Sequence, residues 1–207
     1  MKNGYFIAFE GIDGSGKSTQ ISLLKQRIEE HSIKCIATRE PSDGPIGTLL
    51  RQFLTGRITG DESTIAALFM ADRLDHLNNP VNGICKALED GITVLTDRYI
   101  LSNYAYQGVT VPPEWIINCN SLASEALKPN CHIFLDINPE TALERVAKGR
   151  HQTELFETRE RLTNVRKHYF DVFNRLKNDE NIIILDGNRP IQEISDEIWS
   201  KTSHWFT

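Results

Sequence analysis

Apolar residues gather in five short runs along the chain, and the segments between them show helical spacing. Many residues in the runs are β-branched, and the runs do not alternate with polar residues. This pattern is typical of strands covered on both faces, as in a parallel sheet between layers of helices. The runs are Tyr5–Phe9, Lys34–Thr38, Ile92–Thr96, His132–Ile137 and Ile182–Leu185.

The segments between these runs predict helices. Ile21, Leu24 and Ile28 place an apolar stripe along residues 18–30. Proline suits the first turn of a helix, and a glycine such as Gly149 suits its end. The expected helices span 18–30, 62–78, 112–127, 139–149 and 157–177, and a last one starts at Pro190. The alternation predicts an α/β fold, with a five-stranded parallel sheet flanked by helices on both faces.

The size and charge of the chain narrow the classes of function. With 207 residues and no repeat or linker, we expect a single domain over 1–207. The net charge of −5 argues against a dominant nucleic-acid surface, which needs clustered basic residues. No apolar run approaches the ~20 residues of a membrane span, and no signal peptide is evident. We therefore expect a cytoplasmic protein without nucleic-acid or membrane partners, whose four cysteines are reduced core residues.

Residues 11–18 match the phosphate-binding loop (P-loop) motif G-x-x-x-x-G-K-[ST]. The loop follows a predicted strand and precedes a predicted helix, which is the context that the motif requires. We expect Lys17 to reach the β- and γ-phosphates of ATP and the Ser18 hydroxyl to bind Mg²⁺. The residues expected to contact the nucleotide are Gly11, Ile12, Asp13, Gly14, Ser15, Gly16, Lys17, Ser18 and Thr19.

Polar residues follow the predicted strands at the edge where α/β sheets bind ligands. Asp97 and Arg98 come directly after the third run. An Asp here suits the Mg²⁺ shell and an Arg suits phosphate oxygens, although a local ion pair between the two fits the same dipeptide. The sequence is equally consistent with two interpretations of Arg39 and Arg51: side chains that bind phosphate, and ordinary surface charges.

Phe69 and Arg73 lie four residues apart on a predicted helix and share a face. A ring and a guanidinium placed this way can stack on a base and donate to its carbonyl. A core Phe beside a solvated or Asp-paired Arg fits the spacing better. Farther along, the segment 149–153 holds Arg150, which suits either a lid that closes over a transferred phosphoryl group or a polar turn.

Together these segments resemble the thymidylate kinase family, which phosphorylates dTMP with ATP. The P-loop is generic, whereas Ala-Asp-Arg and Ala-Tyr-Gln-Gly in this order are specific. The matching segments are 9–19, Thr-Arg-Glu-Pro at 38–41, Leu-Phe-Met-Ala-Asp-Arg at 68–73 with His76, Asp-Arg-Tyr at 97–99 and Ser-Asn-Tyr-Ala-Tyr-Gln-Gly at 102–108. The resemblance implies the three-layer architecture of P-loop kinases with a short lid at about 149–157.

The resemblance also implies roles at the base. Phe69 would stack on thymine, and Arg73 would donate to the base O4. Gln107 would contact the opposite part of the base edge, with Asn103 in the same substrate site. The resemblance thus assigns Phe69 and Arg73 to a binding site, whereas their spacing alone favours a core Phe and a solvated or Asp-paired Arg.

Further roles follow for the sugar and the acceptor phosphate. Asp13 would hold the deoxyribose 3′-OH, and Tyr106 would lie beneath the sugar and disfavour a 2′-OH. Arg39, Arg51 and Arg98 would grip the acceptor phosphate. Arg98 would also act in catalysis. The Mg²⁺ role expected for Asp97 and Ser18 rests on their positions after a predicted strand and in the P-loop.

One feature divides the family. Some members carry an arginine just after the P-loop Asp, where this chain has Gly14. Others resemble bacterial enzymes and supply the arginine from the lid, for which Arg150 is the first candidate and Arg145 the second. The lid of this chain lacks the several arginines of other forms. The resemblance further implies a homodimer, with helices 62–78 and 112–127 as candidates for the contact.

Two other kinds of function share these features. A deoxynucleoside kinase, or a monophosphate kinase with another base preference, has the same loop and sheet. A nucleoside kinase accepts an uncharged 5′-OH and does not need an arginine cluster. A nucleotide-dependent switch is the alternative from another class, but the chain has no N-K-x-D motif. We therefore predict in-line transfer of the ATP γ-phosphoryl group to dTMP, giving dTDP.

Overall fold

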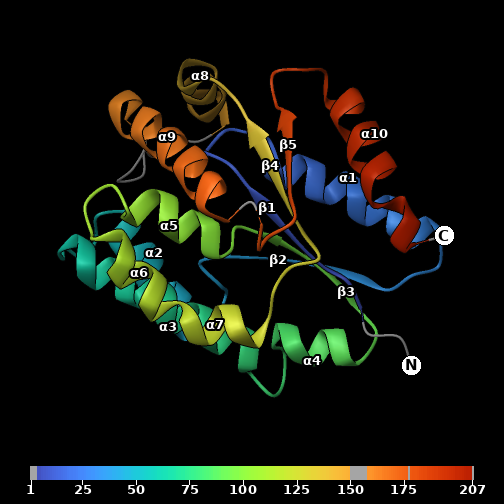
Figure 1. Cartoon of the computed structure of the whole chain (residues 1–207), viewed down its shortest axis with the longest axis horizontal. Coiled ribbons are helices and arrows are strands. Elements are labelled where there is room, and N and C mark those ends of the chain that lie inside the picture. Colours follow the sequence, from blue (N-terminus) through green and yellow to red (C-terminus); the bar gives the residue numbers. More distant parts are fainter. Residues whose placement is uncertain (1–3, 150–157, 177, 207) are drawn as a thin grey trace.

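The computed structural model describes residues 4–149, 158–176 and 178–206. Its centre is a five-stranded parallel sheet in the order β2-β3-β1-β4-β5 (Figure 1). The predicted α/β class is confirmed, and each strand overlaps the run predicted for it. The strands are β1 (Phe6–Glu10), β2 (Cys35–Arg39), β3 (Thr93–Asp97), β4 (Cys131–Asp136) and β5 (Ile182–Asp186).

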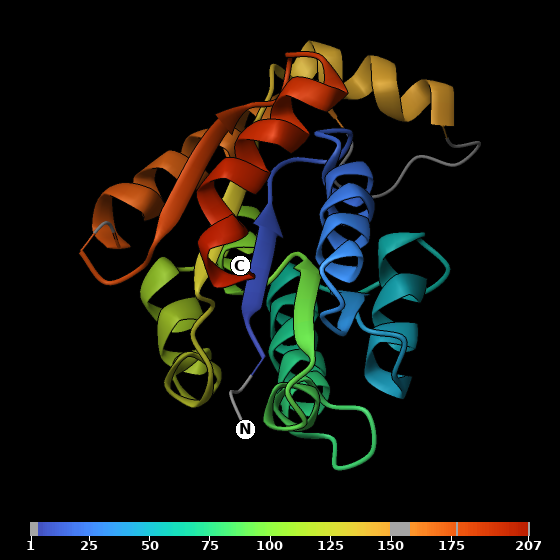
Figure 2. The same ribbon diagram turned by 90° about the vertical axis from the view of Figure 1, so that its right-hand side faces the viewer.

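Helices cover both faces of the sheet. One face carries α1 and α10, which pack side by side, and the other carries α3, α4, α5 and α9 (Figures 1 and 2). The helices of the described residues are α1 (Lys17–Glu30), α2 (Pro45–Leu54), α3 (Glu62–Asn78), α4 (Ile84–Glu89), α5 (Ile100–Gln107), α6 (Pro113–Cys119), α7 (Ser121–Ala126), α8 (Pro139–Gly149), α9 (Arg159–Leu176), α10 (Ile191–Thr202) and the short 3₁₀ helix η1 (Ser203–Trp205). None of these described helices is long and apolar enough to cross a membrane.

The side chains of β1 alternate between the two helical layers. Ile7 and Phe9 pack in the core beneath α1 and α10. Phe6 and Ala8 pack in the core on the opposite face, with side chains of α3 and α4. Because every residue of β1 is buried, this strand fixes the sheet between its two layers.

The two edge strands are less covered than their apolar runs indicate. Ile36 of β2 is 39% exposed and Ile184 of β5 is 48% exposed, whereas β1 is fully buried. An apolar run gives the composition of a strand, but its place in the sheet depends on which strands it pairs with. The strand order therefore decides the burial of these two residues.

The prediction of a single helix over 112–127 is wrong. The segment forms two helices, α6 and α7, which meet at Asn120. The Asn120 side chain is buried and donates to the Ile116 carbonyl at 2.9 Å, so a polar side chain occupies the junction. The helices α2, α4 and α5 lie outside the predicted set, although Pro45 at the start of α2 is a signal for it.

The four cysteines are free, as expected, but only two of them have the buried position of core residues. Cys35 and Cys131 are buried, and burial raises the pKa of each thiol to about 12. Cys85 and Cys119 are only partly buried. Thiols with such high pKa values are poor nucleophiles, so the two buried cysteines belong to the packing of the fold.

Candidate active site

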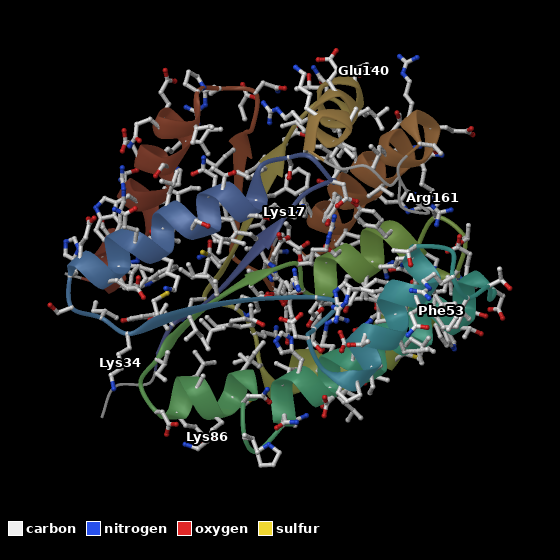
Figure 3. The ribbon with its side chains drawn as sticks, turned by 180° about the vertical axis from the view of Figure 1, so that it is seen from behind. Lys17, Lys34, Phe53, Lys86, Glu140 and Arg161 are labelled. Atoms are coloured by element: carbon white, nitrogen blue, oxygen red, sulfur yellow. The ribbon has the colours of Figure 1, made fainter. Side chains whose placement is uncertain are left out.

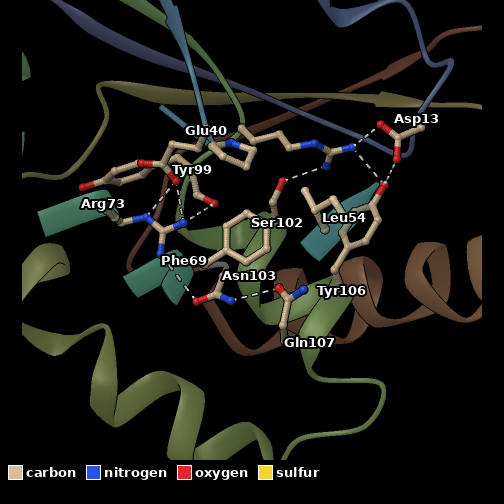
Figure 4. Close-up of a pocket in the computed structure, with 12 residues that line it drawn as sticks. Asp13, Glu40, Leu54, Phe69, Arg73, Tyr99, Ser102, Asn103, Tyr106 and Gln107 are labelled. Carbon is tan, nitrogen blue, oxygen red and sulfur yellow. Dashed lines mark hydrogen bonds and ion pairs between the residues drawn. The ribbon is translucent and has the colours of Figure 1, made fainter. Parts of the chain in front are cut away.

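A cleft at the carboxyl edge of the sheet adjoins a smaller pocket. The P-loop cleft is lined by Asp13, Gly14, Gly16, Lys17, Ser18, Thr19, Arg39, Glu40, Pro41, Arg51, Leu54, Asp97, Arg98, Arg145 and Val146. The inner pocket is lined by Asp13, Glu40, Pro41, Leu54, Phe69, Arg73, Arg98, Tyr99, Ser102, Asn103, Tyr106 and Gln107 (Figure 4). The two spaces meet at the side chains that line both, which are Asp13, Glu40, Pro41, Leu54 and Arg98.

Lys17 begins α1 and lies inside the fold, whereas Lys34 and Lys86 lie at its periphery (Figure 3). Its ammonium donates to the carbonyls of Gly11 at 3.1 Å and Ile12 at 3.2 Å. Burial, and then the positive charge of Arg98, lower the pKa of Lys17. An anion in the cleft would favour the charged ammonium, because opposite charges stabilise each other at close range.

The P-loop requires glycine where α8 approaches it. Gly14 has φ +79°, and a Cβ there would lie 2.5 Å from the Ala142 carbonyl oxygen. The left-handed backbone and the close approach both exclude a side chain. The loop ends at Gly16, directly before α1, so the N-terminus of this helix points its N–H groups into the cleft.

Ser18 and Asp97 converge from α1 and the end of β3. The Ser18 hydroxyl donates to the Asp97 carboxylate at 3.0 Å. The other carboxylate oxygen of Asp97 is buried, accepts no hydrogen bond from the described residues and lies 3.8 Å from the Lys17 ammonium. A hydroxyl and a carboxylate fit Mg²⁺, which takes few protein oxygens and keeps phosphate and water ligands. Among the described residues, no group of three or more His, Cys, Asp or Glu gathers to hold a metal.

Arg98 follows β3 with φ +75°, which is rare for a residue with a side chain. Its guanidinium donates to Asp13 at 2.8 Å and to the Tyr106 hydroxyl at 2.9 Å. It also donates to Ser102 at 3.0 Å and to the Gly11 carbonyl at 3.2 Å. The ion pair of Arg98 therefore runs to Asp13 of the P-loop, rather than to the adjacent Asp97, which was the alternative that the dipeptide left open.

Glu10, which sequence reasoning missed, supports the inner pocket from behind through hydrogen bonds to two residues that line it. It ends β1, is fully buried, and accepts from the Tyr99 backbone N–H at 3.0 Å. Its other oxygen accepts from Ser102 and, at 3.0 Å, from Tyr169. Burial raises the pKa of this carboxyl. The available signal was a charged residue that ends a wholly apolar run directly before the P-loop.

Arg73 lies on the wall of the inner pocket, one helical turn after Phe69, and both line it. It is 1% exposed, and its guanidinium donates to Glu40 at 2.6 Å and 3.0 Å (Figure 4). Spacing alone favoured a solvated or Asp-paired arginine. Glu40, for which no role was predicted, is the partner in the structure. The pairing compensates the charges of two side chains that are each almost fully buried.

Arg39 and Arg51 both reach the P-loop cleft, but their surroundings differ. Arg39 is 62% exposed at its side chain and pairs with Asp43 at 2.7 Å. Arg51 donates to the Ser42 carbonyl at 2.7 Å, and the Ser42 N–H donates to Asp72 at 2.7 Å. Asp72, for which the sequence also predicted no role, thus fixes Ser42, whose carbonyl accepts the hydrogen bond from Arg51.

The predicted lid is only partly described. Arg150 and the rest of residues 150–157 lie outside the described residues. Arg145, the second candidate, lines the P-loop cleft from α8 and donates to the Gly187 carbonyl through both terminal nitrogens at 3.2 Å. An arginine is therefore present on the lid side of the cleft.

Comparison with known proteins gives a consistent result. The family model described as thymidylate kinase matches residues 9–198. A thymidylate kinase of Symbiobacterium thermophilum is 36% identical over 197 residues, which cover 93% of this chain and 90% of the relative. One of Leptospira borgpetersenii serovar Hardjo-bovis is 38% identical over 193 residues, with coverages of 93% and 90%. A probable thymidylate kinase of Pyrobaculum calidifontis is 37% identical over 194 residues, with 93% of each chain covered.

Proposed function

The chain belongs to the thymidylate kinase family, and we propose that the P-loop cleft and the inner pocket together form its active site. As a member of that family, the protein transfers a phosphoryl group from ATP to dTMP and releases dTDP and ADP. One observation supports the location most strongly: the P-loop cleft and the inner pocket share lining side chains, namely Asp13, Glu40, Pro41, Leu54 and Arg98.

The P-loop cleft takes the triphosphate of ATP. Residues 11–19 surround its phosphates, and the Lys17 ammonium neutralises charge on the β- and γ-phosphates. Ser18 and Asp97 hold Mg²⁺, supported by their convergence and by the buried Asp97 oxygen that accepts no hydrogen bond from the described residues. When bound, the metal offsets negative charge on the phosphate oxygens.

Arg98 bridges donor and acceptor. Its guanidinium lies where the two spaces meet, so it contacts the acceptor phosphate and the transferred group together. Its charge stabilises the transition state, because the site holds the group in place before the reaction starts. Arg51 and Arg39 grip the acceptor phosphate from the rim of the cleft. Arg150 acts from the lid, and Arg145 is the alternative.

The inner pocket takes the deoxynucleoside. Phe69 stacks on thymine, Arg73 donates to O4, and Gln107 with Asn103 contacts another part of the base edge. Asp13 holds the 3′-OH of the sugar. Tyr106 lies beneath the sugar, and its ring stacks against the Arg98 guanidinium at 4.6 Å, which supports a fixed position for it.

We further propose a single domain over 1–207 with a lid at about 149–157, acting as a homodimer in the cytoplasm. A size-exclusion measurement with light scattering tests the assembly, since a dimer has twice the 23.5 kDa mass of the chain. A monomeric mass at assay concentrations would reject the dimer.

The reaction is tested by ADP release with ATP, Mg²⁺ and a panel of acceptors: dTMP, dUMP, dCMP, dGMP, UMP and thymidine. We expect strong preference for dTMP over dCMP, and a smaller margin over dUMP because one methyl group contributes only about 1–3 kcal/mol. Activity on thymidine alone would indicate a nucleoside kinase and remove the acceptor-phosphate roles. Tight ATP binding without any turnover would indicate a nucleotide-dependent switch.

A further inference from the structure

The Glu10 carboxylate gathers hydrogen bonds from three segments at the end of β1, directly before the P-loop. One of its oxygens accepts from the Tyr99 backbone N–H at 3.0 Å. The other accepts from the Ser102 hydroxyl and, at 3.0 Å, from the Tyr169 hydroxyl. These donors belong to the turn after β3, to α5 and to α9. Glu10 is fully buried, so removal of its carboxylate would leave buried donors without an acceptor.

The first of these bonds holds the backbone turn that carries Arg98. Arg98 has φ +75°, a conformation that is rare for a residue with a side chain and that persists only where the surroundings impose it. Its own N–H donates to the Phe9 carbonyl at 2.9 Å, and the next N–H along the chain, that of Tyr99, donates to Glu10. The end of β1 therefore binds the N–H groups on both sides of the Arg98 Cα.

The second bond reaches the guanidinium of Arg98 through Ser102. The Arg98 side chain has donors and no acceptor, and it donates to the Ser102 oxygen at 3.0 Å. A serine hydroxyl has a single hydrogen, and Ser102 donates it to Glu10. Glu10 thus orients the hydroxyl so that its oxygen is free to accept from Arg98. The backbone and the side chain of Arg98 are both connected to this one buried carboxylate.

Glu10 differs from the other carboxylate and hydroxyl partners of Arg98 in its position relative to the ligands. Asp13 and Tyr106 also accept from Arg98, but both line the inner pocket and are assigned to the sugar (Figure 4). A bound nucleotide therefore competes for them. Glu10 is not among the described residues that line the P-loop cleft or the inner pocket. Its support of Arg98 consequently persists when both substrates are bound.

We propose that Glu10 is a positioning residue for phosphoryl transfer, which holds Arg98 at the border of the two spaces through its backbone and its side chain. The inference rests on the proposed role of Arg98 between donor and acceptor. A misplacement of about 1 Å can lower a rate by about 10²-fold, because the charges that stabilise a transition state must be in place before the reaction. Loss of this support should therefore lower kcat.

Two substitutions of Glu10 separate its hydrogen bonds from its charge. Glu10→Leu has a similar volume and accepts no hydrogen bond. Glu10→Gln keeps an oxygen for the Tyr99 N–H and places its NH₂ group toward Ser102. The Ser102 oxygen can accept from this group and from Arg98, and its hydrogen can turn to the Tyr169 oxygen, which lies 2.8 Å away. The glutamine therefore keeps Arg98 in place without a charge.

We expect Glu10→Leu to lower kcat with dTMP by at least about 10-fold, because Arg98 loses its support. Glu10→Gln should stay within about 3-fold of the wild type, because its hydrogen bonds are replaced rather than lost. An equal fall in the two variants would assign the effect to charge and overturn the proposal. Wild-type kcat in folded Glu10→Leu would overturn it as well.

The affinity for ADP distinguishes this role from damage to the P-loop, which begins at the next residue, Gly11. ADP lacks the transferred group, so its binding reports on the loop without the contact proposed for Arg98. We expect the Kd for ADP in Glu10→Leu to stay within about 3-fold of the wild type while kcat falls, since the lost interaction belongs to the transition state. A loss of ADP affinity as large as the loss of kcat would overturn the proposal.

A second variant decides the matter if Glu10→Leu does not fold. Ser102→Ala removes the link from Glu10 to the guanidinium and leaves the bond to the Tyr99 N–H intact. We expect kcat to fall by about 3- to 10-fold, the effect of one lost hydrogen bond to a charged group. Ser195→Ala is the matched control, because Ser195 is also buried in a helix and is not among the residues described as lining either space. An unchanged kcat in folded Ser102→Ala, or an equal fall in the control, would overturn the proposal.

An Arg98→Ala background tests whether Glu10 acts through Arg98. Binding of dTMP, measured by calorimetry, is the readout, so no turnover is needed. Glu10→Leu should weaken dTMP binding in the wild-type background and not weaken it further in Arg98→Ala, since residues that act through one another are not additive. A further loss there would show another path, contrary to the proposal. A wild-type enzyme without activity on dTMP would instead reject the proposed function itself.

Discussion

The guanidinium of Arg98 donates to the carboxylate of Asp13 across 2.8 Å, so the turn after β3 is tied to the P-loop. Arg98 holds this position with a left-handed backbone, φ +75°. Such strain persists only where the surrounding structure imposes it, and it is found often at functional sites. Because both side chains border the P-loop cleft and the inner pocket, this ion pair marks the place where we propose that the phosphoryl group crosses.

Replacing Lys17 tests the donor site. We expect Lys17→Ala to lower kcat by at least about 10²-fold, the range seen when one charge-stabilising group is removed, while the protein still folds. ADP release and thermal unfolding measure the two effects. Lys25→Ala is the control, since Lys25 lies on the same helix in an exposed pair with Glu29. Wild-type turnover by folded Lys17→Ala would remove this residue from the mechanism.

Asp97→Asn tests the proposed metal site. The amide keeps the shape but loses the charge that favours a divalent cation. We expect the Mg²⁺ concentration for half-maximal rate to rise by about 10- to 100-fold, and chelation by EDTA to stop the wild-type reaction until Mg²⁺ is restored. Asp90→Asn serves as control, because Asp90 forms an exposed pair with Lys86. An unshifted Mg²⁺ titration for Asp97→Asn would place the metal elsewhere.

Substitutions at two P-loop glycines distinguish the cost of backbone strain from the cost of a steric clash. Gly14 and Gly16 both have positive φ, 79° and 96°. A Cβ at Gly16 meets no described heavy atom within 4 Å, whereas one at Gly14 lies 2.5 Å from the Ala142 oxygen. Gly16→Ala should lower the free energy of unfolding by about 1–2 kcal/mol, the penalty of a left-handed conformation.

Gly14→Ala should lower the free energy of unfolding by more than Gly16→Ala, because the loop or α8 must also move. Urea unfolding of the two variants measures the difference. Equal losses of unfolding free energy in the two variants would mean that α8 moves aside at no cost in free energy. The same contact explains why an arginine after Asp13, as some family members have, does not fit the close packing of α8 on this loop.

The buried pair of Arg73 and Glu40 predicts a separable effect on stability. Arg73→Ala leaves the Glu40 carboxylate buried without its partner, which destabilises the fold by about 3–5 kcal/mol. The double variant Glu40→Gln with Arg73→Ala removes the unpaired charge and should recover part of that loss. Urea unfolding tests this, and a double variant no more stable than the single one would refute it.

Arg73→Ala should also reduce the preference for dTMP over dCMP more than it changes the affinity for ATP. The guanidinium is the donor proposed for the base O4, and it does not line the P-loop cleft. Acceptor competition and ATP titration on the folded fraction measure the two quantities. An unchanged preference would remove Arg73 from base recognition.

Glu10 predicts a pH dependence of stability. Burial raises its pKa above the usual value of 4.5, so the folded state holds this proton more tightly than the unfolded state. The stabilisation is complete below that value and is lost as pH rises through the raised pKa. Glu10→Gln does not titrate. The unfolding free energy of the wild type minus that of the variant should therefore fall as pH rises above 4.5, and a difference that rises instead would reverse the assignment.

The sequence by itself determined the elements of the fold and the P-loop. Apolar runs without alternation marked the strands, since burial on both faces demands it. The P-loop motif is a local spacing of glycines, Lys17 and Ser18. It can therefore be recognised without knowledge of any distant residue. The segments at 68–73 and 102–108 further pointed to the family and to a base site.

Only the tertiary structure decided the partners of the polar residues. Glu40 meets Arg73 across 33 positions of sequence, and Glu10 meets Tyr169 across 159. Helical spacing placed Arg73 on a face but did not say whether that face met water or a carboxylate. A polar side chain has the same local pattern whether it is solvated or buried in a pair. What distinguishes the two is the free energy of desolvation and pairing, which exists only once distant segments have packed together.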